Sequence, residues 1–433
     1  MKPVRSIQIG LFGLGTVGSG VVKILQSQSK ALEVRMGVRI VLKKICVRSL
    51  SKKRPVRVPR GILTTRPSEI LNDPDIDIVV EVMGGIHPAK EIIARAFAAG
   101  KHVVTANKAL LAEEGDFIFG EARRLSRMFG VEASVCGGIP IIKSVKEGLA
   151  SNEISHILGI MNGTCNYILT RISQEGADFR SVLKDAQKKG YAEQDPSLDI
   201  DGVDTAHKLA VLSRISFGVS VPMRSIALQG IRGISYSDIA YAKELGYVVK
   251  LLAVAKKEKR GLELRVSPTL LPLAHPLANV SGVYNGVFLH ADQAGDQLFY
   301  GRGAGMMPTA SAVMSDILDI SQILRNGGGE WAGFSDARGG RLRVLPAGES
   351  VSKYYLRFQV ADKSGVLGRI AMTLGKHGIS ILSVHQKESH ESKSVPVVIL
   401  TYEAKEKNLK AALRVIDAQK ETSQKTVVMR VEA

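Results

Sequence analysis

The amino-acid sequence predicts an α/β chain in three parts: a parallel, doubly wound N-terminal domain, an α+β middle domain and a small C-terminal βαββαβ domain. Three observations lead to this fold class. A glycine-rich turn joins a β-prone run to an apolar helix near the N-terminus, buried strands alternate with helices up to about residue 136, and a smaller strand and helix pattern fills residues 351–433. The length of 433 residues also exceeds what one hydrophobic core supports.

The composition is that of an ordinary globular protein, with 45% hydrophobic and 23% charged residues. No apolar run approaches the roughly 18 residues of a membrane span, and the glycine-rich turn begins too early for a signal peptide to precede it. We therefore expect a cytoplasmic protein with no membrane partner. The cysteines Cys46, Cys136 and Cys165 lie far apart, so neither a disulfide framework nor a zinc site is indicated.

The first strand and the glycines that follow it form a dinucleotide-binding pattern. Residues 6–12 are β-prone, the next six read Gly-Leu-Gly-Thr-Val-Gly, and apolar residues then recur at helical spacing. Gly13 makes the turn, Gly15 admits a pyrophosphate to the helix N-terminus, and Gly18 lets helix and strand pack closely. We expect a Rossmann-type dinucleotide-binding domain over residues 1–136, with Thr16 and Val17 also at the cofactor.

A second predicted strand, residues 38–47, ends at Arg48, where such sheets usually carry an acid for the ribose hydroxyls. An arginine can accommodate a 2′-phosphate, so NADP(H) is favoured and NAD(H) remains possible. Arg48 lies in a stretch, residues 34–68, with eleven basic and no acidic side chains, in a chain whose formal net charge is +18. Such a stretch can hold a phosphorylated small molecule, and the alternatives are a nucleic-acid footprint and a solvated loop.

The alternation continues with predicted strands at residues 77–83, 102–105 and 132–135 and helices at 88–99 and 113–129. Ligands of open α/β sheets bind outside the carboxyl ends of the strands, which places Thr105 and Lys108 at the cofactor pocket. A long predicted helix, residues 306–325, returns to complete this domain, and Gly303 in the glycine-rich turn before it is a further expected cofactor contact.

The middle domain, residues 137–305, contains an acidic loop that leads into an apolar helix. Strands are expected at 154–161 and near 225–231, 248–256, 262–269 and 283–291, with a helix from residue 166, an irregular loop over 191–199 and a helix from Val203. Asp204 and Lys208 are four apart and so neighbours on one side of that helix, and further carboxylates approach from the loop. A lysine ringed by carboxylates is a candidate proton donor. An N-cap at Asp201 and an ordinary surface pair remain the alternative interpretation.

The C-terminal residues are expected to form a linker followed by a smaller unit of strands and helices. Residues 326–350 are rich in glycine and arginine and are expected to form a linker. The predicted order from 351 to 433 is strand 354–360, a helix to about 377, strands 379–386 and 395–402, helix 409–416 and strand 426–431. We expect this unit to fold separately, so that residues 1 to about 345 fold and act without it.

Taken together, the ordered motifs resemble those of one enzyme family, the homoserine dehydrogenases. They are the glycine turn, Ala106-Asn107-Lys108, the run GGIPII from Gly137, the run GIMNGTCNYIL from Gly159 and the acidic loop. The resemblance covers residues 1 to about 345, and the remainder resembles an ACT domain, a small-ligand regulatory module. Ser364 stands where proline often precedes the glycine of that module.

The resemblance implies an NAD(P)-dependent interconversion of L-homoserine and L-aspartate 4-semialdehyde. It makes Lys208 the proton donor and acceptor and Lys108 the second lysine at the reacting centre. It makes Glu193 the acid that binds the homoserine amino group, and Asp199 and Asp204 acids that hold the substrate or orient Lys208. It also implies a site for Na⁺ or another monovalent cation, formed by Glu132 with the carbonyl oxygens of Val135, Gly137 and Ile139.

The same resemblance implies an amino-acid effector, L-threonine by pathway logic, bound near the backbone amides of Gly365, and a homodimer or homotetramer. Two other classes of protein remain as alternatives. A nucleic-acid-binding regulator is disfavoured because the basic stretch lacks interleaved aromatic residues and no helix-turn-helix is visible, so no nucleic-acid partner is expected. A degenerate member kept only as an amino-acid sensor is disfavoured because both lysines and Glu193 are present.

Overall fold

The computed structural model describes residues 5–327, 342–387 and 394–432. The chain divides into two compact units, and each combines segments that are distant in the sequence. Unit 1 consists of Met1–Ile154, His207–Met223 and Ala291–Leu342; unit 2 consists of Ser155–Ala206, Arg224–His290 and Arg343–Ala433. Among the described residues, none of the helices combines the length and apolar character needed to cross a membrane.

Unit 1 is built on a parallel sheet with the strand order β3-β2-β1-β4-β5-β6, which is the doubly wound order of dinucleotide-binding proteins. Its elements are β1 (Arg5–Phe12), α1 (Thr16–Met36), β2 (Val38–Cys46), β3 (Leu63–Thr64), α2 (Ser68–Leu71), β4 (Ile78–Glu81), α3 (Ala89–Ala98), β5 (His102–Thr105), α4 (Lys108–Glu113), α5 (Gly115–Arg124), β6 (Phe129–Gly130), α6 (Ile141–Lys143), β12 (Gly295–Arg302) and α12 (Met306–Arg325). The expected N-terminal fold class is confirmed.

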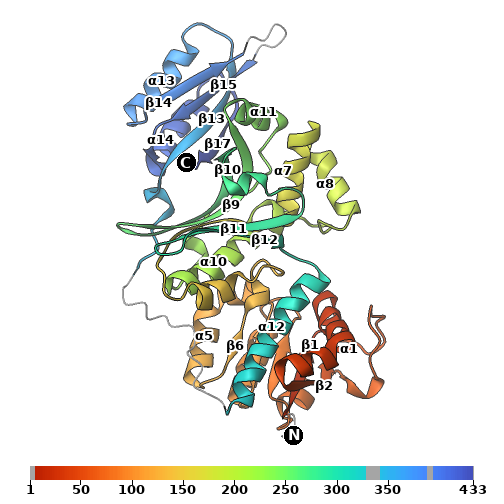
Figure 1. Ribbon diagram of the computed structural model, residues 1–433. Helices are drawn as coiled ribbons and strands as arrows, with labels where there is room; N and C mark the ends of the chain where they lie inside the picture. Colours follow the sequence, from red (N-terminus) through yellow and green to blue (C-terminus); the bar gives the residue numbers. More distant parts are fainter. Residues whose placement is uncertain (1–4, 328–341, 388–393, 433) are drawn as a thin grey trace. The chain divides into compact units, whose positions relative to one another are not determined.

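Helix α12 packs against α1 on one side of this sheet (Figure 1). The approach is close at Gly20, where a Cβ atom would lie 2.6 Å from the carbonyl oxygen of Met306 and 2.7 Å from the Cβ of Ala310. Val313 and Ile317 of α12 are fully buried in the same cluster as the inward residues of β1. The return helix expected from the sequence therefore belongs to the core of unit 1.

Two predictions for unit 1 are wrong in detail. The strand expected at residues 132–135 is a 3-10 turn, Glu132–Ser134, because the buried Glu132 carboxylate accepts the amide N–H groups of Ile142 and Lys143 and turns the chain inward. The helix expected at residues 113–129 is two helices, α4 and α5, and the second ends at Arg124, just before Ser126 takes a positive φ of 52°. Asn107 starts α4 five residues earlier than expected by accepting the amide N–H of Leu110.

Unit 2 contains a mixed sheet that runs from the middle of the sequence into the C-terminal module, residues 351–433. Its strands follow the order β11-β7-β9-β10-β17-β13-β15-β14. The strands are β7 (Ile154–Ile160), β8 (Ala227–Leu228), β9 (Tyr247–Glu258), β10 (Gly261–Pro272), β11 (Tyr284–Ala291), β13 (Val351–Ala361), β14 (Ile381–Gln386), β15 (Ser394–Thr401), β16 (Ala404–Lys405) and β17 (Thr422–Val431). The helices are α7 (Gly163–Glu175), α8 (Phe179–Lys188), α9 (Ser197–Ile200), α11 (Tyr236–Glu244), α13 (Val366–Lys376) and α14 (Glu406–Asp417), and α10 (Val203–Phe217) runs from unit 2 into unit 1.

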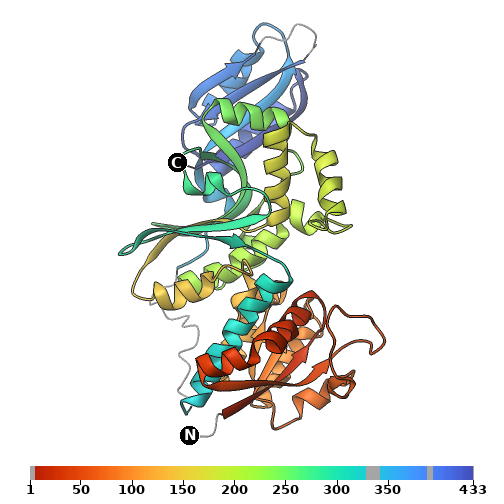
Figure 2. The same cartoon turned by 45° about the vertical axis from the view of Figure 1, so that its right-hand side comes forward.

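The C-terminal module is joined to the middle strands by backbone pairing rather than by side-chain contact alone. Strand β17 lies parallel to β10 with Thr269 opposite Arg430, and the amide N–H of Glu432 donates to the carbonyl of Leu270 at 3.0 Å. Figures 1 and 2 show the green strands of the middle region continuing into the blue strands of this module. The predicted βαββαβ order of the module is confirmed.

Some predictions for unit 2 are also wrong. The loop expected to be irregular over residues 191–199 contains α9, because the Asp195 carboxylate accepts the amide N–H of Ser197 and Pro196 is compatible with a helix start. The helix expected from residue 166 begins at Gly163, where Asn162 caps it by accepting the amide N–H of Cys165. Helices α8 and α11 were not foreseen. Most of the expected linker, residues 328–341, lies outside the described residues.

Candidate active site

The glycine turn of unit 1 has the geometry expected of a phosphate-binding turn. Gly13 has φ 99° and donates its N–H to the carbonyl of Cys46 on the neighbouring strand at 3.0 Å. A Cβ on Gly18 would lie 2.2 Å from the carbonyl oxygen of Gly13, so only glycine permits this contact. At Gly15 a Cβ would meet no atom within 4 Å, and no side chain caps α1, which leaves its first amide N–H groups available to an anion.

A cavity of about 220 Å³ lies at this turn, within unit 1. It is lined by Thr16 and Val17 of α1, by Lys108 of α4, by Lys208 of α10 and by Gly303. Ser134, Gly137 and Thr309 also line it. Five residues predicted separately from the sequence as cofactor or catalytic groups therefore surround one space.

Lys108 is positioned by a chain of hydrogen bonds that begins in the sheet. The buried Glu81 carboxylate accepts the hydroxyl of Thr105 at 2.7 Å, and that hydroxyl accepts the amide N–H of Asn107 at 3.0 Å. The side chain of Asn107 also donates to the carbonyl of Gly85 at 2.6 Å. Thr105 is fully buried and is not among the residues lining the cavity, so its contribution here is to hold the turn that presents Lys108.

Lys208 lies on α10 with only 7% of its surface exposed. The helix is held in unit 1 by an ion pair between Arg214 and Asp116 and by His207, whose Nε2 lies 3.7 Å from the Glu113 carboxylate. A buried ammonium on an anchored helix has a restricted position. Such a group is suited to donate a proton to an oxygen in the cavity.

Two of the three carboxylates expected at the substrate, those of Asp199 and Asp204, form a cluster in unit 2 around Asn162. Its amide Nδ2 donates to Asp199 at 2.7 Å and to Asp204 at 3.0 Å. Thr164 adds a hydrogen bond from its hydroxyl to Asp199 at 3.1 Å. Asn162 and Thr164 were not predicted as site residues, although both stand in the Gly159 run that carried the family resemblance. Glu193 is exposed, and among the described contacts its backbone carbonyl, rather than its side chain, accepts a bond from Gln187.

The predicted cation ligands lie close together in the sequence but have different surroundings. Burial raises the pKa of the Glu132 carboxyl to about 7, although two backbone amides oppose that shift. The carbonyl of Ile139 accepts the N–H of Ile141 at 2.8 Å, Val135 is fully buried, and Gly137 lines the 220 Å³ cavity. Carboxylate and carbonyl oxygens are suitable donors for a hard cation. Among the described residues, no group of three or more His, Cys, Asp or Glu side chains could hold a metal ion.

Two further predicted residues lie outside these clusters. Arg48 is exposed, two residues beyond Cys46, whose carbonyl binds the glycine turn. Within the basic stretch, Lys43 pairs with Asp73 and Asp75 at 2.8 Å, so that lysine serves the surface of unit 1. Gly365 directly precedes α13 and has φ 85°, a conformation that favours glycine, and no side chain caps the helix start, which leaves backbone amides exposed.

A doubly wound sheet with a glycine turn, two lysines at one cavity and an appended βαββαβ module defines a nicotinamide-dependent oxidoreductase with a regulatory domain. The family models that match carry the descriptions "Homoserine dehydrogenase, NAD binding domain" over residues 13–132, "Homoserine dehydrogenase" over 140–318 and "ACT domain" over 354–421. The homoserine dehydrogenase of Synechocystis sp. is 45% identical over 98% of this chain and 99% of its own.

Similarity to solved structures leads to the same family as the family models. A homoserine dehydrogenase from Thiobacillus denitrificans gives a TM-score of 0.92 at 40% identity, covering 99% of this chain and 98% of its own. A hyperthermophilic archaeal homoserine dehydrogenase in complex with NADPH gives 0.62 at 27% identity, covering 74% of this chain and 98% of its own. The chain belongs to the homoserine dehydrogenase family. It is an oxidoreductase with an NAD-binding domain, a catalytic domain and an ACT domain, as the sequence motifs predicted.

Proposed function

We propose that the chain interconverts L-homoserine and L-aspartate 4-semialdehyde with Lys208 as the group that moves the proton at the substrate oxygen. The observation that carries this proposal is the cavity in unit 1, where Lys108 and Lys208 lie at the same space as Thr16 and Val17 of the glycine turn. When bound there, the reduced nicotinamide supplies a hydride. The open approach to Gly15 and the first amides of α1 fit its pyrophosphate.

The chain's own residues then perform three tasks in reduction. The ammonium of Lys208 donates a hydrogen bond to the aldehyde oxygen, stabilises the negative charge that develops on it and transfers the proton. Lys108, held by Asn107, adds a second positive charge and orients the same oxygen. Oxidation of homoserine uses the reverse steps, with Lys208 receiving the proton.

Asp199 and Asp204 are proposed to bind the substrate or to orient Lys208, and Glu193 to bind the amino group. Asp204 stands one turn before Lys208 on α10. The Asn162 amide supports this role because it fixes the two carboxylates relative to each other.

Replacement of Lys208 tests the mechanism. We expect Lys208→Ala to reduce kcat by about 10² to 10⁴-fold, the usual contribution of general acid catalysis, while the coenzyme Kd changes little. Lys30→Ala, which removes an exposed lysine of α1, is the matched control. If Lys208→Ala retains most of its kcat, the proton is transferred by another group.

For the coenzyme we propose NADP(H), with NAD(H) as the weaker ligand. Arg48 supports this preference because it is exposed just beyond the strand that binds the glycine turn, and the archaeal relative binds NADPH. Arg48→Ala should raise the KM for NADPH more than that for NADH. Arg39→Ala, at the other end of β2, is the control, and an equal loss for both coenzymes would remove Arg48 as the selective group.

Three further assignments are proposed with the same enzyme. Glu132 with the carbonyls of Val135, Gly137 and Ile139 would hold Na⁺ or another monovalent cation. A lower melting temperature in tetramethylammonium chloride than in sodium chloride would support this cation site.

L-Threonine would bind near Gly365 and inhibit the dehydrogenase activity of a homodimer or homotetramer in the cytoplasm. Threonine titrated against wild type and Gly365→Asn, which tolerates the positive φ, should inhibit the variant less.

A further inference from the structure

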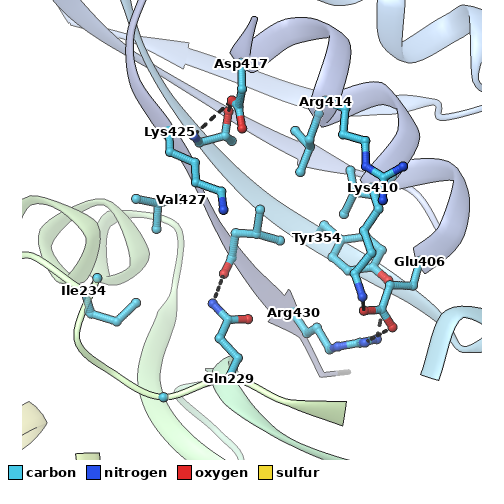
Figure 3. A pocket seen from close by; sticks show the side chains of 16 residues that line it. Gln229, Ile234, Tyr354, Glu406, Lys410, Arg414, Asp417, Lys425, Val427 and Arg430 are labelled. Atoms are coloured by element: carbon cyan, nitrogen blue, oxygen red, sulfur yellow. Dashed lines mark hydrogen bonds and ion pairs between the residues drawn. The ribbon is translucent and has the colours of Figure 1, made fainter. Parts of the chain in front are cut away.

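One cavity of unit 2 has a lining that does not include the proposed effector residue Gly365. It has a volume of about 620 Å³ and lies between the C-terminal module and the loop formed by residues 229–234. Figure 3 shows the side chains of α14 and β17 on one side and Gln229 and Ile234 of the loop on the other. Its volume is within the range of small-molecule sites.

The lining of this cavity combines an apolar wall with positive charge. Ile234, Leu409 and Leu413 are buried or half-buried and supply the apolar surface. The two carboxylates of the lining already have partners: Glu406 pairs with Arg430 and Lys410 at 2.7 Å, and Asp417 accepts the amide N–H of Thr426 at 3.1 Å. An incoming ligand therefore meets few uncommitted acceptors.

The cations Arg414 and Lys425 differ from these paired groups. Both line the cavity and are exposed, and within the described part of the chain neither has an ion-pair partner. One comes from α14 and the other from β17, so they approach the space from different elements (Figure 3). Two unpaired cations beside an apolar wall fit a carboxylate attached to a hydrocarbon body.

The loop that forms the opposite wall is attached to the carboxylate cluster. The amide N–H of Ile231 donates to the carbonyl of Ile200 at 2.8 Å, and the Arg232 guanidinium pairs with the Asp201 carboxylate. A Cβ on Gly230 would lie 2.2 Å from the carbonyl oxygen of Ile200, so the two segments are in direct contact. Ile200 ends α9, the helix that carries Asp199.

We propose that this cavity is an effector site for small carboxylates with an apolar body, and that its occupant alters substrate binding through the residue 229–234 loop and α9. The assignment of the effector site depends on the cavity alone. Its coupling to substrate binding rests on the proposed role of Asp199 at the substrate. A ligand that fits the loop in one position only would change the affinity for substrate by its differential binding.

Binding is tested on the full chain by titration calorimetry, which needs no turnover and so remains informative if the proposed mechanism fails. The probes are 4-methylpentanoate, 3-methylbutylamine, which lacks the carboxylate, and inorganic phosphate, which lacks the apolar body. We expect 4-methylpentanoate to bind more tightly than either of the others. The double variant Arg414→Ala/Lys425→Ala should weaken its binding by about 10-fold or more, because charge-assisted hydrogen bonds are lost.

The matched control is the double variant Lys376→Ala/Lys420→Ala, which removes two exposed lysines of the same module that do not line the cavity. Circular dichroism confirms that both variants fold. Absence of 4-methylpentanoate binding, equal binding of the amine or of phosphate, or equal loss in the control would overturn the assignment of the site.

The coupling is tested by homoserine oxidation with and without saturating 4-methylpentanoate. We expect the KM for homoserine to change by about 5-fold or more, the lower range of allosteric coupling, while the KM for the coenzyme stays constant. An unchanged KM for homoserine would overturn the coupling. A change that persists in Arg414→Ala/Lys425→Ala at the same probe concentration would overturn the cavity as its origin.

Discussion

Replacing Glu432 with alanine should destabilise unit 2 far more than its place next to the end of the chain suggests. The Glu432 carboxylate pairs with Arg265 and Lys256 of the middle strands, and Arg265 also pairs with Glu263 at 3.1 Å. Arg430, 3.8 Å from Glu263, connects this group to Glu406. Three cations thus face three carboxylates, and the substitution leaves one positive charge uncompensated.

The magnitude follows from the burial of Arg265, whose side chain is 1% exposed. Burial, together with repulsion from Arg430, lowers the pKa of Arg265 to about 10, so the guanidinium stays charged at neutral pH. Removing one partner of a buried ion pair typically costs about 3 to 5 kcal/mol. Because Glu263 remains beside Arg265, we expect a loss near the lower limit, about 3 kcal/mol.

The assay is urea unfolding at pH 7.5 followed by circular dichroism, analysed for more than one transition because the chain has two units. Glu403→Ala is the control, since Glu403 is exposed on the same module and should change stability by less than about 0.5 kcal/mol. A loss below about 1 kcal/mol for Glu432→Ala would refute the reasoning. By the same argument a chain ending near residue 345 lacks β17 and should not fold unit 2, contrary to the expectation from sequence.

Gly15→Ala should keep normal stability but weaken coenzyme binding, whereas Gly18→Ala, whose Cβ would clash with backbone, should lower the melting temperature; the reverse pattern would contradict the turn geometry. Asn162→Leu should lower kcat/KM for homoserine without changing the coenzyme Kd, because the Asp199 and Asp204 carboxylates lose their shared hydrogen-bond donor. An unchanged kcat/KM would show that Asn162 does not position these carboxylates for the substrate. Burial, assisted by a nearby arginine, lowers the pKa of His102 to about 4, so stability present above about pH 6.5 should be lost as the pH falls toward 4. His102→Asn, which can still accept the amide N–H of Met128, should flatten this decline in acid melting curves.

Local patterns led to the predicted coenzyme site, and Thr16, Val17, Lys108, Lys208 and Gly303 line one cavity. The glycine spacing fixes a strand, a turn and a helix within one short stretch, and the rule for the carboxyl ends of parallel strands located Lys108. Lys208 was singled out by its four-residue spacing from Asp204. Each of these predictions depends on backbone geometry within a short stretch of the chain, which a sequence pattern can reveal.

Interactions between distant residues were not predictable in the same way. Glu132 was placed in a strand because nothing in its neighbours reveals that its carboxylate binds amides ten residues later. Asn162 joins two carboxylates that lie 37 and 42 residues further along the chain. The pairing of β17 with β10 follows from no periodicity, since each strand has a reasonable pattern without the other.

The β10–β17 pairing also sets the order in which the protein can be made. During synthesis, Arg265 is made 167 residues before its ion-pair partner Glu432. At about 5 to 20 residues per second of synthesis, this interval lasts roughly 8 to 33 s. During that time the edge of β10 at Thr269 and Leu270 lacks its partner strand and is a site for mispairing with other chains. Unit 2 therefore completes its sheet only after β17 and Glu432 have been synthesised.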